Sequence, residues 1–209
     1  MKLQIALDID WSKASRILEQ VQAYIDIVEI GTPLIFLEGL SLVERVREQF
    51  PGLMILADLK IVDAGEMEAS LAFQAGVDIV TVLGLAPDST ILGALESARI
   101  YQKQVMLDMM QVQDLLARSR WVLDHGADYI CAHLAHDLQD GNQSHLSNLR
   151  TLRENLPGAK LAIAGGIDLE TIEALKPLDP EIIIVGKAIS LADDPCQIAS
   201  LMHLKINDE

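Results

Sequence analysis

Asp58, Lys60 and Asp63 form an Asp-x-Lys-x-x-Asp motif at the end of an apolar run that is expected to be a β-strand. Three ionisable groups at these spacings do not fit one face of a regular strand, so we expect the strand to give way to a loop inside the motif. The loop would crowd an ammonium group between two carboxylates. Such crowding contributes little to a hydrophobic core and is typical of an active site. For Lys60, a plain salt bridge is the alternative.

Glu29 is a second candidate because it stands inside the apolar run at residues 25–30, which is also expected to be a strand. Burying an unpaired carboxylate costs free energy, so Glu29 needs a cation, a metal ion or a dense shell of hydrogen bonds. Glu29 and Asp58, on neighbouring strands, could present oxygen ligands to Mg²⁺ and leave positions open for water and substrate. We therefore expect these two residues to bind Mg²⁺, with Mn²⁺ as the alternative metal.

Two glycine segments directly follow apolar runs near the C-terminus, Gly165-Gly166 and Gly186-Lys187. Glycine lets backbone N–H groups approach an anion, a following helix N-terminus adds a positive dipole, and Lys187 could add a charge. Two tight turns without a ligand are the alternative explanation. Both segments follow what would be the seventh and eighth strands of an eight-stranded α/β barrel, where such barrels commonly bind phosphate, so we expect them to form a phosphate site.

Short apolar runs recur about every 25 residues along the chain and alternate with amphipathic segments of helical period, such as residues 40–50. We expect strands at residues 3–7, 25–30, 53–57, 77–83, 105–109, 129–132, 161–164 and 182–185. Near-continuous apolar strands separated by helices indicate a parallel sheet that is covered on its faces. Eight repeats without a linker predict a closed (βα)8 TIM barrel, with residues 1–209 as a single α/β domain.

In such a barrel, the loops after the carboxyl ends of the strands form the active site. Polar side chains of this sequence gather at these strand ends: Asp8, Glu29, Asp58 with Lys60 and Asp63, Thr81, Asp108 and His133. Taken singly, a carboxylate here could cap the next helix, and His133 could be a buried core histidine. The repeated placement at equivalent strand ends favours a site.

Other polar residues fit structural roles. The strand beginnings carry three aspartates for which we expect ordinary turn and solubility roles: Asp26, Asp78 and Asp128. Three histidines occur in helix or loop contexts and are expected at the surface: His125, His145 and His203.

The composition argues against several function classes. The chain has 209 residues and a formal net charge of −15, so it lacks the basic stripe with which proteins bind nucleic acid non-specifically. Its two cysteines, Cys131 and Cys196, suggest neither a disulfide framework nor a zinc site, and a reducing cytoplasm fits. Asp8 comes too early for a signal peptide, and no apolar run approaches the roughly 20 residues that span a bilayer. We expect a cytoplasmic protein with no membrane association.

Five segments resemble the orotidine 5'-monophosphate decarboxylase suprafamily of phosphate-binding barrels, which is recognised by its Asp-x-Lys-x-x-Asp motif. They occupy residues 3–8, 28–33, 56–65, 81–84 and 162–167 and are most similar to the 3-hexulose-6-phosphate synthases. Orotidine monophosphate decarboxylases are metal-free and have a lysine where Glu29 stands. Glu29 therefore indicates the Mg²⁺-dependent branch, which also contains the 3-keto-L-gulonate-6-phosphate decarboxylases.

The resemblance implies a mechanism. Glu29 and Asp58 would hold Mg²⁺ on the carbonyl and hydroxyl oxygens of a ketose phosphate, where it stabilises a 1,2-enediolate. Lys60 would add positive charge and a hydrogen bond to this intermediate, and His133 is the candidate proton shuttle.

The resemblance also implies substrate contacts and an oligomeric state. Asp8 would orient the substrate hydroxyl groups, and Thr32 would contribute to substrate binding. Asp63 would reach across a dimer interface into the partner's site. The implied functional unit is a homodimer with shared active sites.

Residues 133–139, His-Leu-Ala-His-Asp-Leu-Gln, separate two activities that share the enediolate. Decarboxylases of this family tend to have His-x-x-Arg here, whereas the synthases tend to have His-Thr-Gly-x-Asp-x-Gln. The chain has no arginine at that spacing and ends in the Asp-x-Gln of the synthases, although Leu134 and Ala135 replace Thr-Gly. Asp108 stands where the decarboxylases have glutamate, which also favours a synthase.

The expected reaction is the condensation of formaldehyde with D-ribulose 5-phosphate to D-arabino-3-hexulose 6-phosphate. Decarboxylation of 3-keto-L-gulonate 6-phosphate is the first alternative. A barrel that binds a sugar phosphate without turnover is the second.

Overall fold

The computed structural model describes residues 1–138 and 144–207, in which eight parallel strands close into a barrel. Each strand pairs with the next along the chain, and β8 pairs with β1 to complete the ring. The strands are β1 (Lys2–Leu7), β2 (Ile27–Ile30), β3 (Met54–Ile61), β4 (Ile79–Leu83), β5 (Gln104–Asp108), β6 (Tyr129–His133), β7 (Leu161–Ala164) and β8 (Ile182–Val185). The predicted closed (βα)8 barrel is confirmed.

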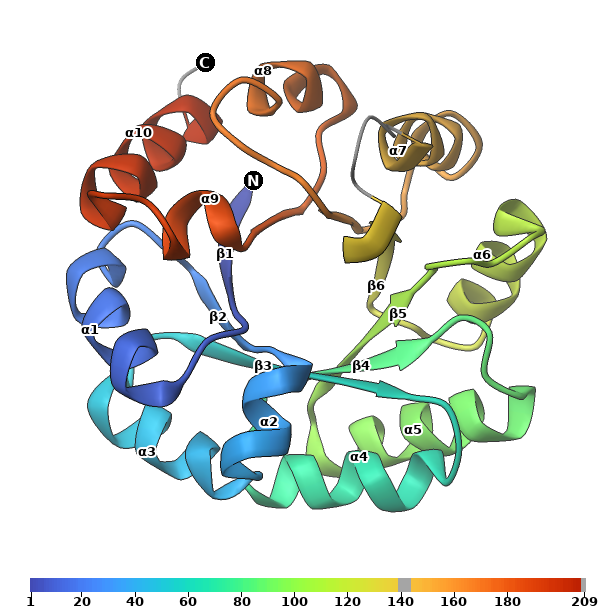
Figure 1. Ribbon diagram of the computed structural model, residues 1–209. Helices are drawn as coiled ribbons and strands as arrows, with labels where there is room; N and C mark the ends of the chain where they lie inside the picture. Colours follow the sequence, from blue (N-terminus) through green and yellow to red (C-terminus); the bar gives the residue numbers. More distant parts are fainter. Residues whose placement is uncertain (139–143, 208–209) are drawn as a thin grey trace.

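Helices surround the barrel on its outer side (Figure 1). The α-helices are α1 (Trp11–Val21), α2 (Thr32–Glu38), α3 (Ser41–Gln49), α4 (Gly65–Gln74), α5 (Asp88–Tyr101), α6 (Leu115–Asp124), α7 (Ser144–Asn155), α8 (Ile172–Leu175), α9 (Lys187–Ser190) and α10 (Pro195–Asn207). Two short 3₁₀ helices are η1 (His136–Leu138) and η2 (Lys176–Leu178). The predicted alternation of strands and helices is therefore observed.

The strands are buried on both faces, as their near-continuous apolar sequences predict. Along β1, Leu3, Ile5 and Leu7 belong to the core between barrel and helices, and the alternating Gln4 and Ala6 face the barrel interior. Inward-facing side chains fill the interior: Ile27, Leu56, Ile79, Met106, Tyr129, Ala162 and Ile182. The barrel is thus a packed core, and a ligand reaches its polar residues from one end.

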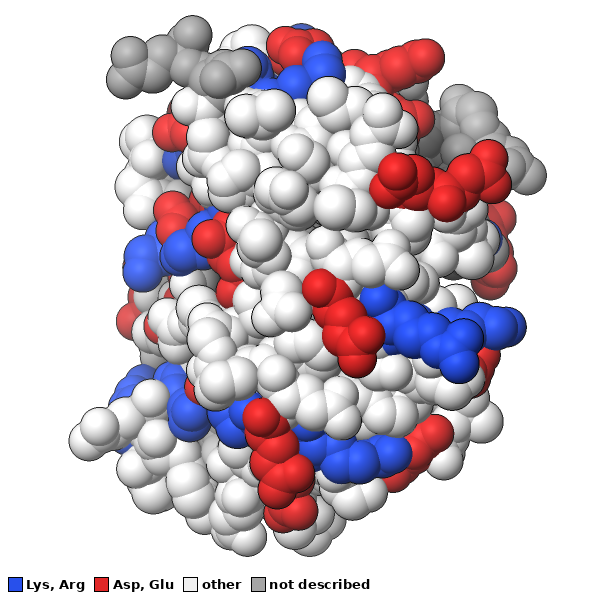
Figure 2. Space-filling model, turned by 90° about the vertical axis from the view of Figure 1, so that its left-hand side faces the viewer, with Lys and Arg blue, Asp and Glu red and all other residues white. Residues whose placement is uncertain are grey.

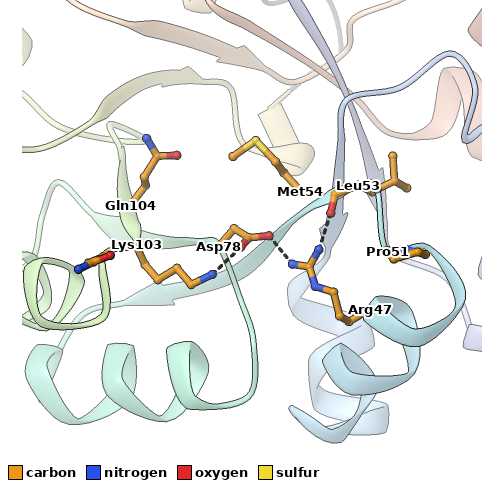
Figure 3. Close-up of a pocket in the computed structure, with 9 residues that line it drawn as sticks. Arg47, Pro51, Leu53, Met54, Asp78, Lys103 and Gln104 are labelled. Carbon is orange, nitrogen blue, oxygen red and sulfur yellow. Dashed lines mark hydrogen bonds and ion pairs between the residues drawn. The ribbon is translucent and has the colours of Figure 1, made fainter.

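Three aspartates fasten the beginnings of alternate strands. Each accepts a hydrogen bond at 2.9 Å from a backbone N–H group of the preceding strand: Asp26 from Leu3, Asp78 from Ile55 and Asp128 from Val105. Asp78 also lies between the side chains of Arg47 and Lys103, with which it forms ion pairs (Figure 3). These residues therefore do more than the turn and solubility roles that the sequence indicated, because they hold neighbouring strands in register.

The expectation of three surface histidines is wrong for His145, whose exposed fraction is 5%. It lies in the first turn of α7, which packs against β6 and β7. His125 and His203 are half-buried, and their Nδ1 atoms contact backbone oxygens at 2.7 and 3.0 Å.

The face that carries α1, α3 and α10 has mixed charge. Lys and Arg side chains lie beside Asp and Glu side chains there, and the residues described on this face form no continuous basic stripe (Figure 2). Within residues 1–138 and 144–207, no helix has the length and apolar character needed to cross a bilayer.

Candidate active site

A pocket of about 780 Å³ opens at the carboxyl ends of the strands. Most of the residues predicted from the sequence line it: Asp8, Glu29, Thr32, Asp58, Lys60, Thr81, Asp108, His133, Gly165, Gly166, Gly186 and Lys187. Small side chains leave room on one side, where Ala6 and Ala164 contribute to the wall. The barrel therefore brings together groups that are far apart in the sequence.

Lys60 is positioned by an irregularity in β3. The strand continues past its predicted end at residue 57 to Ile61, and it gives way to a loop inside the motif, before Asp63, as expected. Its pairing with β4 shifts register between Ala57 and Ile61, and Lys60 has a φ of 48° in the left-handed region. The backbone N–H group of Lys60 donates to Oγ1 of Thr81 at 2.9 Å. A bulge with one strained residue thus redirects the chain just before the expected loop begins.

Asp58 is the centre of the hydrogen-bond network in the pocket. Its Oδ1 accepts from the Thr81 hydroxyl at 2.8 Å, and its Oδ2 lies 2.9 Å from Oγ1 of Thr32. Its Oδ2 also forms an ion pair with Nζ of Lys60. The salt bridge left open as an alternative for Lys60 is therefore present, and it lies inside the pocket.

Lys60 is a cation in this environment. Burial disfavours its charged form, but the charge of Asp58 and the hydrogen bond to it outweigh burial and raise the pKa of Lys60 above its ordinary value. The side chain therefore supplies a positive charge and N–H donors to the pocket at neutral pH, and it is unsuited to act as a base.

Glu29 is buried, with an exposed fraction of 9%. Its Oε2 accepts a hydrogen bond of 2.5 Å from Nε2 of Gln4. Burial, together with the negative charge of Asp58, raises the pKa of Glu29 to about 8. A cation beside these two carboxylates would offset both effects.

The two carboxyl groups of Glu29 and Asp58 suit Mg²⁺ better than a metal ion that takes all of its ligands from the protein. Within the described part of the chain, no group of three or more His, Cys, Asp or Glu side chains is arranged to hold a metal ion. Mg²⁺ usually takes one or two carboxylates and keeps waters or substrate oxygens in its other positions. Glu29 and Asp58 could hold it in this way.

Asp108 and His133 form a pair on neighbouring strand ends. Nδ1 of His133 lies 2.7 Å from Oδ2 of Asp108, and Oδ1 of Asp108 accepts from the backbone N–H group of Met110 at 2.9 Å. Burial disfavours the Asp108 carboxylate, but the hydrogen bond and charge of His133 outweigh burial and lower its pKa. His133 thus lines the pocket, and Asp108 orients its ring. The alternative of a buried core histidine does not apply.

Glycine is required at two places near the pocket. A Cβ atom on Gly31 would lie 2.1 Å from Oδ1 of Asp8, so glycine allows the Asp8 side chain to take its position. Gly165 has a φ of 105°, and a Cβ there would lie 2.4 Å from the Leu134 carbonyl oxygen. At Gly186 a Cβ would approach nothing closer than 3.8 Å. That glycine borders open pocket space.

Asp63 does not line this pocket. Its side chain is exposed, and its Oδ1 accepts from the backbone N–H group of Ala64 at 2.8 Å. It lines a separate groove with residues of α4 and α5.

The synthase-type segment is only partly described. Ala135 and Asp137 line the pocket, and Leu134 is buried. Gln139, which contributed to the resemblance, lies outside the described residues.

Sequence reasoning missed Gln4, which contacts Glu29 from inside the barrel. The signal was available, because a glutamine that alternates with apolar residues in a buried strand must face the interior or the helices. It also missed the contact between Asp108 and His133, although both residues were placed at strand ends.

Comparisons with known proteins agree with this geometry. A profile of the Orotidine 5'-phosphate decarboxylase / HUMPS family matches residues 1–202. The 3-hexulose-6-phosphate synthase of Bacillus subtilis (strain 168) is 43% identical over 203 residues, which cover 97% of each chain.

Solved structures give the same relationship. The 3-hexulose-6-phosphate synthase from Salmonella typhimurium superposes with a TM-score of 0.95 at 37% identity, covering 99% of this chain and 98% of the other. The 3-keto-L-gulonate-6-phosphate decarboxylase from Vibrio cholerae superposes with a TM-score of 0.87 at 26% identity, covering 99% and 97%. The chain is therefore a lyase that belongs to the Orotidine 5'-phosphate decarboxylase / HUMPS family.

Proposed function

We propose that the protein condenses formaldehyde with D-ribulose 5-phosphate to give D-arabino-3-hexulose 6-phosphate. The observation that carries this proposal is the Asp108–His133 pair. It places an oriented histidine in the same pocket as the Lys60 ammonium group and the carboxyl groups of Glu29 and Asp58. The name of the Bacillus subtilis relative supports the same assignment. A pocket of about 780 Å³ is large enough for a pentulose phosphate and a one-carbon aldehyde.

The reaction requires one proton to leave the substrate and one to be returned. His133 removes a proton from C1 of the ketose phosphate, which leaves the electron pair in an enediolate. C1 then forms a bond to the formaldehyde carbon, and the formaldehyde oxygen takes a proton from the histidine. Asp108 keeps the ring oriented through Nδ1, so that Nε2 is the nitrogen that exchanges protons.

Charge develops on the enediolate oxygens, and the pocket supplies the opposite charge. The Lys60 ammonium donates hydrogen bonds to these oxygens, while Asp8 accepts hydrogen bonds from substrate hydroxyls. Mg²⁺, held by Glu29 and Asp58, would add positive charge beside the same oxygens.

The phosphate group of the substrate would bind at the β7 and β8 ends. Gly165, Gly166, Gly186 and Lys187 line the pocket there. Apolar side chains fill the barrel interior, and the small side chains of Ala6 and Ala164 leave space in the pocket at the end of the barrel. Backbone N–H groups and one lysine thus provide a local anion site in a chain whose formal net charge is −15.

A homodimer would complete the site. Large apolar side chains are exposed around the Asp63 loop, on α2 and α4 at the same side of the barrel (Figure 1): Phe36, Leu37, Val62, Met67 and Leu71. Phe36 is 83% exposed, which is costly unless a partner covers it. A second copy of this chain on that face would cover these residues and could carry Asp63 into the partner's pocket.

The test is an assay of formaldehyde consumption with D-ribulose 5-phosphate, in the presence of Mg²⁺ or excess EDTA. We expect Mg²⁺-dependent consumption that EDTA abolishes and added Mg²⁺ restores. Consumption that EDTA leaves unchanged would contradict the metal role alone. No consumption with the metal present would overturn the synthase assignment, and CO₂ release from 3-keto-L-gulonate 6-phosphate would then be the next assay.

A further inference from the structure

Gln4 is a polar side chain inside the packed barrel. It has no exposed surface, and its register partners on β2 and β8 are the apolar Ile27 and Ile184. Its Nε2 donates to Oε2 of Glu29, whereas its Oε1 has no hydrogen-bond partner among the described residues. A buried amide that is only half satisfied costs free energy, so packing does not explain its presence.

The direction of the hydrogen bond suggests a role. Gln4 lies on β1 and contacts Glu29 on β2 from within the barrel, while Glu29 also lines the pocket. A donor on Oε2 restricts rotation of the carboxylate, while Gln4 itself does not line the pocket. A neutral amide does this without a positive charge that would compete with a bound cation.

We propose that Gln4 is a positioning residue that holds Glu29 in the orientation needed to bind a divalent cation. This inference rests on the proposed function, because it takes Glu29 and Asp58 as the cation ligands. Groups that orient metal ligands from behind typically alter metal affinity by about 10- to 100-fold when they are removed. Gln4 therefore acts through Glu29 and does not touch the substrate.

The first measurement is direct Mn²⁺ binding by isothermal titration to the purified apoprotein. Gln4→Met keeps the length of the side chain but removes the donor. We expect the Kd for Mn²⁺ to rise about 10- to 100-fold. The melting temperature of the apoprotein reports separately on the fold, because the substitution removes a half-satisfied amide but also takes a hydrogen-bond donor from the buried Glu29 carboxyl group.

A matched control and a double substitution isolate the role. Tyr129→Phe removes another buried polar group from the barrel interior, whose hydroxyl lies 3.5 Å from Oε1 of Gln104, and it should leave the Kd unchanged. In a Glu29→Gln background, Gln4→Met should weaken Mn²⁺ binding no further. In the formaldehyde assay, the Gln4→Met protein should need a higher metal concentration for its half-maximal rate. At saturating metal, its kcat should be close to that of the wild-type protein.

The outcomes separate this inference from the proposed function. If the wild-type protein binds no Mn²⁺, the cation site is wrong and the role of Gln4 falls with it. If the wild-type protein binds Mn²⁺ and Gln4→Met binds it within twofold, only the role of Gln4 is overturned. An equal loss of Mn²⁺ affinity in Tyr129→Phe would mean that any change in the barrel interior weakens binding, and it would also overturn the role of Gln4. Should Gln4→Met fail to fold, Gln4→Leu provides the same test.

Discussion

Nδ1 of His133 lies 2.7 Å from Oδ2 of Asp108, which joins the ends of the neighbouring strands β6 and β5. The other oxygen of Asp108 accepts from the Met110 backbone at 2.9 Å. Because an ionised carboxylate only accepts hydrogen bonds, the Nδ1 atom of His133 carries the proton, which leaves Nε2 as the ring nitrogen that can accept one. One carboxylate therefore orients the ring and selects its tautomer.

Asp108→Asn should reduce kcat about 100-fold while the protein stays folded. Met110 and His133 contact different oxygens of Asp108, so an asparagine that accepts from Met110 turns its NH₂ group toward Nδ1 of His133 and favours the wrong tautomer. Steady-state kinetics across pH checks this, because the profile reports the group that exchanges protons. Unchanged kcat at every pH would contradict the role of the pair.

Lys60→Ala should lower kcat/KM about 1000-fold, because the positive charge beside Asp58 is lost where negative charge develops. Steady-state kinetics and a thermal melt provide the measurement. Lys13→Ala is the matched control, since Lys13 also pairs with an aspartate but its side chain is 73% exposed. Normal turnover by Lys60→Ala would remove this residue from the mechanism.

Asp63→Asn and Lys60→Ala proteins should complement each other when their subunits are mixed. If Asp63 serves the partner's pocket, a mixed dimer has one site with both substitutions and one with neither. Random exchange would then restore about a quarter of wild-type activity. Unfolding and refolding the two proteins together, followed by the formaldehyde assay, measures this.

Two other results would contradict shared sites. Full activity of Asp63→Asn alone would show that the residue is dispensable. No rescue in dimers that demonstrably contain both subunits would show that Asp63 does not serve the pocket of the partner.

The barrel could be predicted because its eight apolar runs are regular in length and spacing. The predicted and observed strands coincide at residues 161–164 and 182–185. The third strand differs, because the bulge near Lys60 depends on a hydrogen bond to Thr81 of the next strand. Sequence periodicity within one strand carries no information about such a contact.

The candidate site could be predicted as a set of residues but not as a set of contacts. Equivalent strand ends converge in any barrel, so the presence of Asp108 and His133 in one pocket follows from topology. Their contact depends on the stagger between β5 and β6, which periodicity does not reveal. The burial of His145 does not follow from the sequence, because a helical position alone does not show which side of α7 faces the barrel.

Gly186→Ala should weaken binding of the sugar phosphate without destabilising the fold. An added Cβ meets no protein atom closer than 3.8 Å, so it occupies space in the pocket. We expect KM to rise about 10-fold or more and inorganic phosphate to inhibit less, while the free energy of unfolding changes by less than about 0.5 kcal/mol. Gly158→Ala is the control, because that glycine is exposed with nothing within 4 Å. Equal KM values for both variants would argue against a phosphate site at Gly186.

Asp78→Asn should destabilise the protein by about 1–3 kcal/mol at pH 7, because Asp78 accepts from Ile55 and pairs with Arg47 and Lys103 (Figure 3). Burial opposes ionisation of Asp78, but its hydrogen bonds and the neighbouring cations outweigh burial, and its pKa is lowered. A lowered pKa gives stability that is complete above the unfolded value, about 3.9, and is lost as the pH falls through the folded value. The difference between wild type and Asp78→Asn should therefore shrink below about pH 4.

Urea unfolding of both proteins between neutral and acidic pH measures this difference. Glu96→Gln is the matched control, because Glu96 pairs with Arg99 but its side chain is 57% exposed. Exposed ion pairs of this kind contribute about 0–1 kcal/mol, so the control should unfold almost as wild type does. A difference for Asp78→Asn that stays constant down to the acid limit would mean that altered hydrogen bonding, and not the charge of Asp78, accounts for the destabilisation.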